Sequence, residues 1–446
     1  MINRTFPALD AGRRRSTKAI RRAVAVLLAT TALGGASAHA VDGTWIGSGD
    51  EWTDPSNWSS NPDLPDGTAT FTVNTPTAVQ SNGIVTIGSV QFTQTPNAAA
   101  YTITTNDLFL VNGAGISNNS TNTQTIVTAA TTLFQNASTA SGGSKTVSYF
   151  NVGAMLFQNS STAGTATITN NSSLEFDNTS TAGAAKITNN VVADFFDSSN
   201  AGTSQITNAA GATLTFHDNS TASASTITNS GDVLFLNSSS AGSASLSTTS
   251  GSFATITFND TSTAGNSNIA LVDGTLTFNN SSTAANATIT NNSGGTTTFG
   301  ALGGTDTSNA GTSHITNNNF GITNFFAQTS AMNATIANNS GGNTNFRDQS
   351  TAGNATIVNN SGGTTTFGAM AGTDTASAGG AVIINNSGGT TAFFAATTAG
   401  SATIINSLGG IVQFGDSGGA NDTATAGSST IDNSGVVSFN SKTTAG

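Results

Sequence analysis

Apolar residues recur along this chain at a short and regular interval. From about residue 150, two series of anchors alternate, one of Ile and one of Phe, and successive members of each series are mostly 19 to 21 residues apart. The Ile series is Ile168, Ile187, Ile206, Ile227, Leu246, Ile269, Ile289, Ile315, Ile336, Ile357, Ile383, Ile404 and Ile431. The Phe series is Phe157, Phe176, Phe196, Phe216, Phe235, Phe258, Phe278, Phe299, Phe325, Phe346, Phe367, Phe394, Phe414 and Phe439. This interval is too short for a repeat of two helices and predicts the coil of a β-solenoid.

The residues around the anchors favour strands over helices. They are Thr, Ile, Val and Phe, whereas helix-forming runs are missing after residue 40. Between the anchors lie segments such as NNSGG and STAG, whose Asn and Gly residues tolerate the positive φ of a tight corner. We therefore predict an all-β fold, a parallel β-helix (β-solenoid) with coils of about 19–27 residues. Equivalent residues of successive coils should stack about 4.8 Å apart.

A coil of this length cannot bury its own anchors, so stability must come from stacking on its neighbours. All six prolines precede the repeats, as expected if nearly every backbone N–H of the repeats is needed for a ladder hydrogen bond. We expect the Phe anchors to form one continuous internal stack. Thr365, beside the anchor Phe367, is expected to point outward.

Residues 1–40 have the composition of a signal peptide. Seven of the eleven Lys and Arg residues of the chain lie here, before the apolar run AVAVLLATTALGG and the small-residue segment ASAHA. This is the order of a secretory signal, and it predicts cleavage after Ala40. The remaining chain keeps four cations against twenty-one carboxylates, a formal charge of about −17 by residue count. Such a chain repels nucleic acid, so we expect no nucleic-acid partner.

Residues 41–100 differ from the repeats of residues 101–446. They hold all three tryptophans, Trp45, Trp52 and Trp58, and most of the prolines. The open end of a solenoid core has to be covered, so we predict that this segment is an N-terminal cap followed by irregular first coils. The alternative is that the tryptophans form an aromatic platform for sugar stacking.

This layout resembles the passenger region of a bacterial autotransporter. The resemblance lies in the signal peptide, in the Gly/Asn/Thr-rich strand repeats and in a W-x-G-x-G-x-x-W…N-W…P…A-x-F segment: Trp45, Gly47, Gly49, Trp52, Asn57, Trp58, Pro65, Ala69 and Phe71. The resemblance implies a right-handed parallel β-helix that is secreted or held at the bacterial cell surface. It also implies an outer-membrane β-barrel translocator as a partner. The repeats run to Phe439 without a barrel segment, so we expect either a fragment or a separate translocator.

Candidate catalytic residues are few. His217 and His314 are separated by about five predicted coils and should both point outward. Glu175, Asp177, Asp194 and Asp197 form a local acidic patch, which leaves a polysaccharide-acting enzyme open as the alternative function. We predict no catalytic residue, no cofactor and no metal site, and the preferred function is structural or adhesive, with a host surface or a glycan as ligand.

Three coils contain insertions in the same arm. The Phe-to-Ile distance is usually 10 or 11 residues, but it is 16 from Phe299 and from Phe367, and 17 from Phe414. Insertions confined to one arm must emerge at one corner of the solenoid, where loops commonly form a binding face. Each insertion carries Gly and one Asp: Asp306, Asp374 or Asp422. The favoured interpretation is that they are tolerated surface insertions whose Asp residues keep them soluble, because long insertions in exposed loops cost little stability. The hypothesis beside it is that these candidate residues form a recognition edge or a weak cation-binding edge.

Overall fold

The computed structural model describes residues 40–370, 372–416 and 422–446. Residues 41–446 form one compact unit, which is described below. The predicted signal peptide lies outside the described residues except for Ala40, so it stays a prediction. Among the described residues, no helix is both long and apolar enough to cross a membrane.

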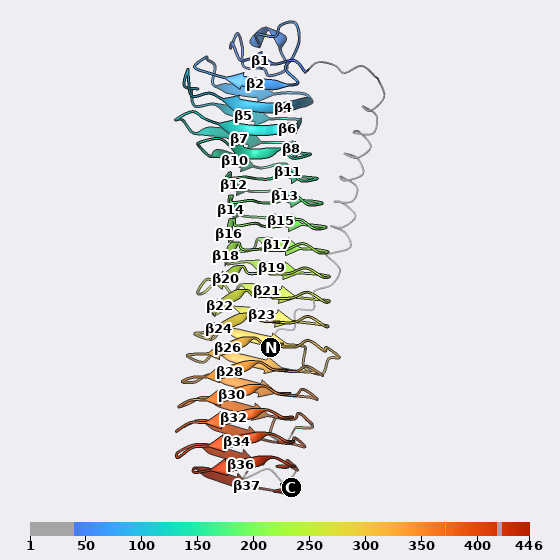
Figure 1. Ribbon diagram of the computed structural model, residues 1–446, viewed down its shortest axis with the longest axis vertical. Helices are drawn as coiled ribbons and strands as arrows, with labels where there is room; N and C mark the ends of the chain where they lie inside the picture. The colour runs from blue at the N-terminus through green and yellow to red at the C-terminus, as the bar shows by residue number, and fades with distance from the viewer. Residues whose placement is uncertain (1–39, 371, 417–421) are drawn as a thin grey trace. The chain divides into compact units, whose positions relative to one another are not determined.

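Residues 41–446 form a β-solenoid (Figure 1), as the sequence predicts. The described residues contain 37 strands and one short 3-10 helix, η1 (Pro55–Asn57). Each regular coil contributes one strand to each of two parallel sheets. We name them the Phe sheet and the Ile sheet after their inward anchors. The Ile sheet has 17 strands, which corresponds to a rod of about 80 Å at the usual strand spacing.

The Phe sheet contains β1 (Gly43–Thr44), β2 (Thr68–Phe71), β4 (Val85–Phe92), β6 (Leu108–Asn118), β8 (Thr131–Phe134), β9 (Thr139–Gly142), β11 (Ala154–Phe157), β13 (Ser173–Phe176), β15 (Val192–Phe195), β17 (Thr213–Phe216), β19 (Asp232–Phe235), β21 (Thr255–Phe258), β23 (Thr275–Phe278), β25 (Thr296–Phe299), β27 (Ile322–Phe325), β29 (Asn343–Phe346), β31 (Thr364–Phe367), β33 (Thr390–Phe393), β35 (Ile411–Phe414) and β37 (Val436–Phe439).

The Ile sheet contains β3 (Ala78–Ser81), β5 (Thr102–Thr105), β7 (Gln124–Thr128), β10 (Val147–Asn151), β12 (Thr167–Asn170), β14 (Lys186–Asn189), β16 (Gln205–Asn208), β18 (Thr226–Asn229), β20 (Ser245–Thr248), β22 (Asn268–Val272), β24 (Thr288–Asn292), β26 (His314–Asn317), β28 (Thr335–Asn338), β30 (Thr356–Asn359), β32 (Val382–Asn385), β34 (Thr403–Asn406) and β36 (Thr430–Asn433).

A third ladder runs through the STAG corners. Single residues from Thr139 to Thr444 pair in parallel, coil after coil, between the two sheets. In this corner the Thr hydroxyl accepts the backbone N–H two residues later, as from Gly353 to Thr351 Oγ1 at 3.0 Å. Gly353 has a φ of +60°, and a Cβ there would lie 2.9 Å from the carbonyl oxygen of Met332, so glycine suits the position. Each coil is thus hydrogen bonded to its neighbours on three sides.

The Phe anchors form a continuous stack inside the rod. From Phe134 to Phe439, the ring centroids of successive coils lie 4.5–5.0 Å apart and their planes differ by 2–14°. The sequence prediction is wrong at two positions, because Phe195 and Phe393 are the stacked residues rather than Phe196 and Phe394. Side chains alternate along a strand, and Ala193 and Thr391 are the inward residues that fix this phase.

The expectation for Thr365 is also wrong. Thr365 lies two residues before Phe367 in β31, so both side chains face the interior, and Thr365 is fully buried. Its hydroxyl donates to Oδ1 of Asn359 at 2.8 Å. The outward residues of this strand are Thr364 and Thr366, which are half-buried.

Buried asparagines form a second internal column. They lie at or next to the C-terminal end of the Ile-sheet strands, in one buried run from Asn151 to Asn229 and a second from Asn291 to Asn406, with Thr248 and Leu271 between the runs. Asn433 continues the second run in the last coil, where it is exposed. In most steps Nδ2 donates to Oδ1 of the equivalent residue in the next coil, as from Asn317 to Asn338 at 2.7 Å. We name this column the asparagine ladder. The sequence analysis assigned these residues to the corners, whereas the positive φ angles of the NNSGG corners fall mainly on Gly.

The N-terminal segment covers the first end of the core. Trp45, Trp52 and Trp58 are at most 1% exposed, and each ring centroid lies within 6 Å of that of Phe71. Nε1 of Trp58 donates to the carbonyl oxygen of Trp52 at 2.8 Å. The tryptophans therefore act as a cap, and in this arrangement they offer no exposed platform for a sugar.

Candidate functional site

The corner that follows each Phe is built on a ladder of its own. In the short coils, the second residue after Phe has a positive φ and is usually Asn or Asp. Its side-chain oxygen accepts the backbone N–H of the equivalent residue in the preceding coil, as from Asn159 to Asn178 and from Asn178 to Asp197, both at 3.0 Å. We name this the corner ladder. It fixes the left-handed turn without a glycine.

The three long loops leave the rod at this corner. They comprise residues 300–305, 368–373 and 415–421, of which residue 371 in the second loop and residues 417–421 in the third lie outside the described residues. Each begins with a glycine of positive φ, Gly300 (+70°), Gly368 (+74°) or Gly415 (+70°). This turn directs the chain away from the coil directly after Phe. At the apex of the first two loops, Leu302 and Met370 are 68% and 60% exposed.

The predicted site residues Asp306, Asp374 and Asp422 lie where these loops rejoin the rod. One carboxylate oxygen accepts the N–H of the corner-ladder residue in the preceding coil: Asn280 (2.5 Å), Asp348 (2.6 Å) or Ala395 (2.8 Å). The other oxygen accepts the N–H of the second residue of its own loop: Ala301 (3.0 Å), Ala369 (2.8 Å) or Asp416 (2.8 Å). Each Asp therefore closes its loop and holds the ladder position that an Asn or Asp holds in a short coil.

This arrangement explains the matching aspartates without invoking a ligand. Hydrogen bonds from two backbone amides satisfy much of each carboxylate, and the Arg347 guanidinium also lies 3.9 Å from Oδ2 of Asp374. Among the described residues, no three His, Cys, Asp or Glu side chains are grouped so that they could hold a metal ion. The recognition edge stays a prediction, and its chemistry has to be sought between the loops.

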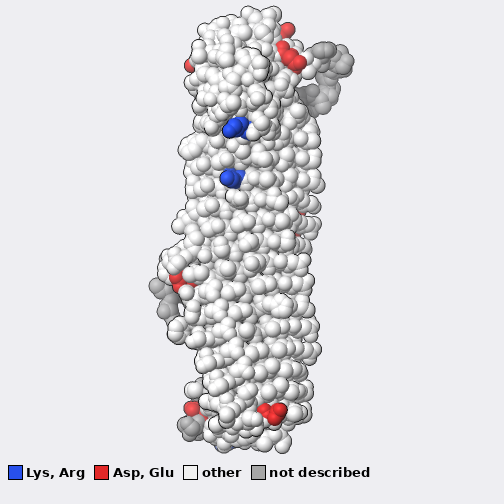
Figure 2. Space-filling view, turned by 60° about the vertical axis from the view of Figure 1, so that its left-hand side comes forward, with Lys and Arg blue, Asp and Glu red and all other residues white. Residues whose placement is uncertain are grey.

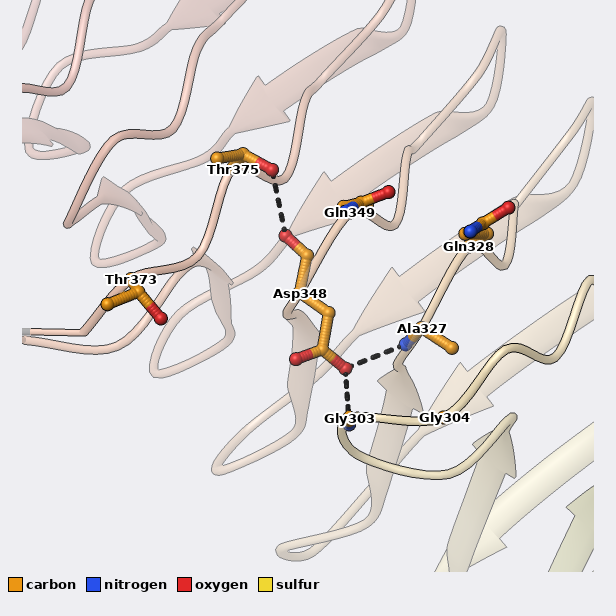
Figure 3. A pocket seen from close by; sticks show the side chains of 8 residues that line it. All are labelled: Gly303, Gly304, Ala327, Gln328, Asp348, Gln349, Thr373 and Thr375. Carbon is orange, nitrogen blue, oxygen red and sulfur yellow. Dashed lines mark hydrogen bonds between the residues drawn. The ribbon is translucent and has the colours of Figure 1, made fainter.

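A pocket of about 290 Å³ lies between the first and second loops (Figure 3). Its floor is the corner of the two short coils that separate these loops. It is lined by Gly303, Gly304, Ala327, Gln328, Asp348, Gln349, Thr373 and Thr375. The sequence analysis recognised the two loops but missed Gln328, Asp348 and Gln349, which belong to ordinary coils.

Asp348 organises this pocket. Its Oδ2 accepts the N–H of Ala327 (2.8 Å), as the corner ladder requires, and also the N–H of Gly303 (2.9 Å) at the tip of the first loop. The second bond ties the first loop to a coil two steps further along the rod. The backbone carbonyl of Asp348 accepts two hydrogen bonds from Thr375, one from its backbone N–H (2.7 Å) and one from Oγ1 (3.4 Å). One residue thus joins both walls of the pocket.

The histidines and the acidic patch lie elsewhere. His314 is exposed at the start of β26, and the His217 ring lies on the ring of Phe196 with centroids 4.3 Å apart. Nε2 of His217 is 3.6 Å from Oδ1 of Asp194, which pairs in register with Glu175. The structure therefore brings one His close to one carboxylate of the patch. His217 and His314 are in coils that the structure keeps apart, as predicted.

The described surface is poor in charge (Figure 2), which agrees with a chain in which only 7% of residues are charged. Thr, Ser and Asn dominate the outward positions of the strands instead. Comparison with protein-family models, with curated protein sequences and with solved structures finds no match.

Proposed function

We propose that this chain is a secreted or cell-surface β-helical passenger with a structural or adhesive role, exported through an outer membrane with the help of a β-barrel translocator. The observation that carries the adhesive role is the confinement of the three long loops to one corner of an otherwise regular rod. A rod of about 80 Å can hold such loops far from its point of attachment.

The construction of the rod suits an exposed location. Cysteine is absent, so folding does not depend on oxidation. Apart from the bond from Gly303 to Asp348, each coil is hydrogen bonded to its two neighbours, so the solenoid can form progressively as the chain emerges from a membrane. An uncharged polar surface with paired strands along its length also leaves few free strand edges for aggregation.

The residues that carry the resemblance to autotransporter passengers pack together in the N-terminal cap. Trp45, Trp52, Asn57, Trp58, Ala69 and Phe71, six of the residues that carry the resemblance, are buried together. Gly47 has a φ of +71°, and a Cβ there would lie 2.0 Å from the carbonyl oxygen of Thr75. These residues are therefore needed for packing in the first coil. Their joint role in one structure supports the proposal that the motif marks an autotransporter passenger.

Export is tested by expressing the chain with residues 1–40 in a Gram-negative host. We expect the protein in the periplasm with Val41 as its first residue, since the small residues before it favour cleavage there. N-terminal sequencing measures this directly. A periplasmic protein that retains residues 13–22, or a protein confined to the cytoplasm, would contradict the proposed secretion.

Adhesion is tested with loop deletions that respect the corner ladder. Removing residues 301–305, 369–373 and 416–421 leaves Phe-Gly-Asp in each coil, so that the Asp falls two residues after Phe, as in the short coils. We expect the melting temperature of this variant to stay close to that of the parent, while binding of protein-coated beads to host cells or polysaccharide surfaces falls. Beads that bind equally well without the loops would refute the adhesive role of this edge.

A further inference from the structure

We infer that the pocket between the first and second loops binds an uncharged sugar unit of a polysaccharide. This inference rests on the proposed adhesive function and names its ligand class.

The two coils between the loops differ from the other coils at one exposed position, the residue that follows the corner-ladder residue. These positions of successive coils form a column along the surface of the rod. The residue after the corner ladder is small or of medium length in most coils, but it is Gln at positions 328 and 349, between the two loops. The equivalent residues elsewhere are Ala137, Ser160, Thr179, Ser198, Asn219, Ser238, Thr261, Ser281, Thr307, Thr375, Ala396, Thr423 and Lys442. Both Gln side chains are exposed and line the pocket. The two long amides thus occur where the loops flank this column on both sides.

The lining suits a ligand rich in hydroxyl groups. Gln328 and Gln349 each offer a donor and an acceptor, Thr373 and Thr375 offer hydroxyls, and Asp348 offers a carboxylate. In the described part of the chain, Oδ2 of Asp348 carries two amide hydrogen bonds, which leaves the acceptor capacity of Oδ1 for a ligand. Ala327 is the one residue of this lining with an apolar side chain, a single methyl group. An apolar peptide side chain would therefore find little to pack against.

The charge of the lining argues against an acidic ligand. Asp348 is the one ionisable residue that lines the pocket, and it is negative. Arg347, in the same coil, lies 3.9 Å from the carboxylate of Asp374 and is thus partly compensated. A sulfated or uronate-rich polysaccharide would meet repulsion without a dedicated cation. The volume of about 290 Å³ is at the lower end of the range for small-ligand sites, about 300–1,000 Å³, and suits one sugar ring.

The experiment measures binding of the purified chain to uncharged oligosaccharides. The probes are oligomers of glucose, galactose, mannose and N-acetylglucosamine, with hyaluronate as the acidic comparator, and the readout is calorimetry or biolayer interferometry. We expect at least one uncharged oligomer to bind and hyaluronate to bind at least tenfold more weakly. Failure of every uncharged oligomer to bind, or a preference for hyaluronate, would overturn the inference.

Two double variants locate the site. Replacing Gln328 and Gln349 by Ser restores the residue type that is common in this column, so the fold should be kept while the affinity for the sugar falls at least tenfold. The matched control, Ser198→Ala with Asn219→Ala, changes the same column in two successive coils away from the loops and should leave the affinity unchanged. Equal affinities of the two double variants would overturn the assignment.

The two proposals fail in different ways. Adhesion that depends on the loops but persists in the Gln328→Ser, Gln349→Ser variant would overturn the sugar pocket and leave the adhesive function standing. Sugar binding by the purified chain without any adhesion of coated beads would overturn the adhesive function and leave the sugar pocket standing.

Discussion

Replacing Asn338 by Ala tests the asparagine ladder, which is the least expected part of the core. Asn338 is fully buried in the middle of the second run of the ladder. Its Nδ2 donates to Asn359 Oδ1 (2.8 Å) and lies 3.1 Å from the carbonyl oxygen of Thr364 and from Oγ1 of Thr365. Its Oδ1 accepts from Asn317 Nδ2 (2.7 Å) and Thr344 Oγ1 (2.8 Å).

The magnitude follows from what this substitution leaves behind. The amide contributes about four hydrogen bonds, and a buried hydrogen bond contributes a net of about 0.5–1.5 kcal/mol, so the upper range is about 2–6 kcal/mol. Asn317 keeps a bond to the carbonyl oxygen of Asn343, and Asn359 Oδ1 keeps the Thr365 hydroxyl, which reduces the loss. The Thr344 hydroxyl loses its acceptor. We therefore expect a loss of about 3 kcal/mol in the free energy of unfolding, felt mainly in the coils next to Asn338.

The assay has to resolve individual coils, because repeat proteins need not unfold in one step. All three tryptophans lie between residues 45 and 58, so their fluorescence reports on the cap alone. Hydrogen exchange followed by mass spectrometry, on peptides that cover β28 to β31, measures the local free energy of opening. Circular dichroism during urea unfolding gives the global comparison.

Asn345→Ala is the matched control. Asn345 lies on the outer face of β29 and makes one side-chain hydrogen bond, from Nδ2 to Asn324 Oδ1 at 3.0 Å. A single partly exposed bond contributes little, so we expect a change of less than about 1 kcal/mol. Equal loss of protection in the two variants would refute the view that the buried ladder, and not asparagine content in general, stabilises the rod.

Phe367→Ala should cost about 3–5 kcal/mol by leaving a cavity in the stack. Thr365→Ala should cost about 1–3 kcal/mol by removing the two buried hydrogen bonds that its hydroxyl makes with Asn359 and Asn338. Urea unfolding measures both, and a neutral Thr365→Ala would contradict its inward placement. Burial raises the pKa of Tyr101 to about 12 and that of Tyr149 well above its usual value. In the unfolded chain both tyrosine side chains ionise near pH 10, so the stability that their burial supports is fully present below pH 10 and is lost as the pH rises towards 12. Ultraviolet titration should therefore show tyrosinate near pH 10 in denaturant but not in the folded protein. Asp374→Ala removes two amide hydrogen bonds and should make the second loop more sensitive to proteases by at least tenfold at an unchanged melting temperature; unchanged cleavage would refute its role in closing the loop.

The architecture was predictable because its signals repeat. Two series of anchors at a constant interval identify a solenoid even where single strands are only four residues long. Where the pattern offers two adjacent candidates, as at Phe195 and Phe196, the choice depends on the phase of the strand. Ala193, two residues before Phe195, is apolar and sets that phase, so stricter use of the two-residue period would have found the correct residue and the inward side of Thr365.

The candidate site was predictable only in part. Insertion lengths identify the corner and the loops, because an extra stretch cannot enter a packed coil. The roles of Asp306, Asp374 and Asp422 in the corner ladder depend on contacts between coils that are some 26 residues apart in sequence. The bond from Gly303 to Asp348 joins residues 45 positions apart, and no spacing rule of the repeat anticipates it. The change to Gln at positions 328 and 349 was visible in the sequence, but its meaning required the register.

Mechanical load would act unevenly on a molecule built in this way. Apart from the bond from Gly303 to Asp348, the coils are hydrogen bonded to the coils directly before and after them, so tension applied at one end of the chain would unfold them one at a time while the others stay folded. A coil of about 21 residues releases roughly 70 Å of extended chain, whereas the rod shortens by only about 4.8 Å. A filament of this kind lengthens under shear without breaking and dissipates energy with every coil that opens. In the proposed cell-surface location, this stepwise opening would limit the force that reaches the contacts proposed for the loops.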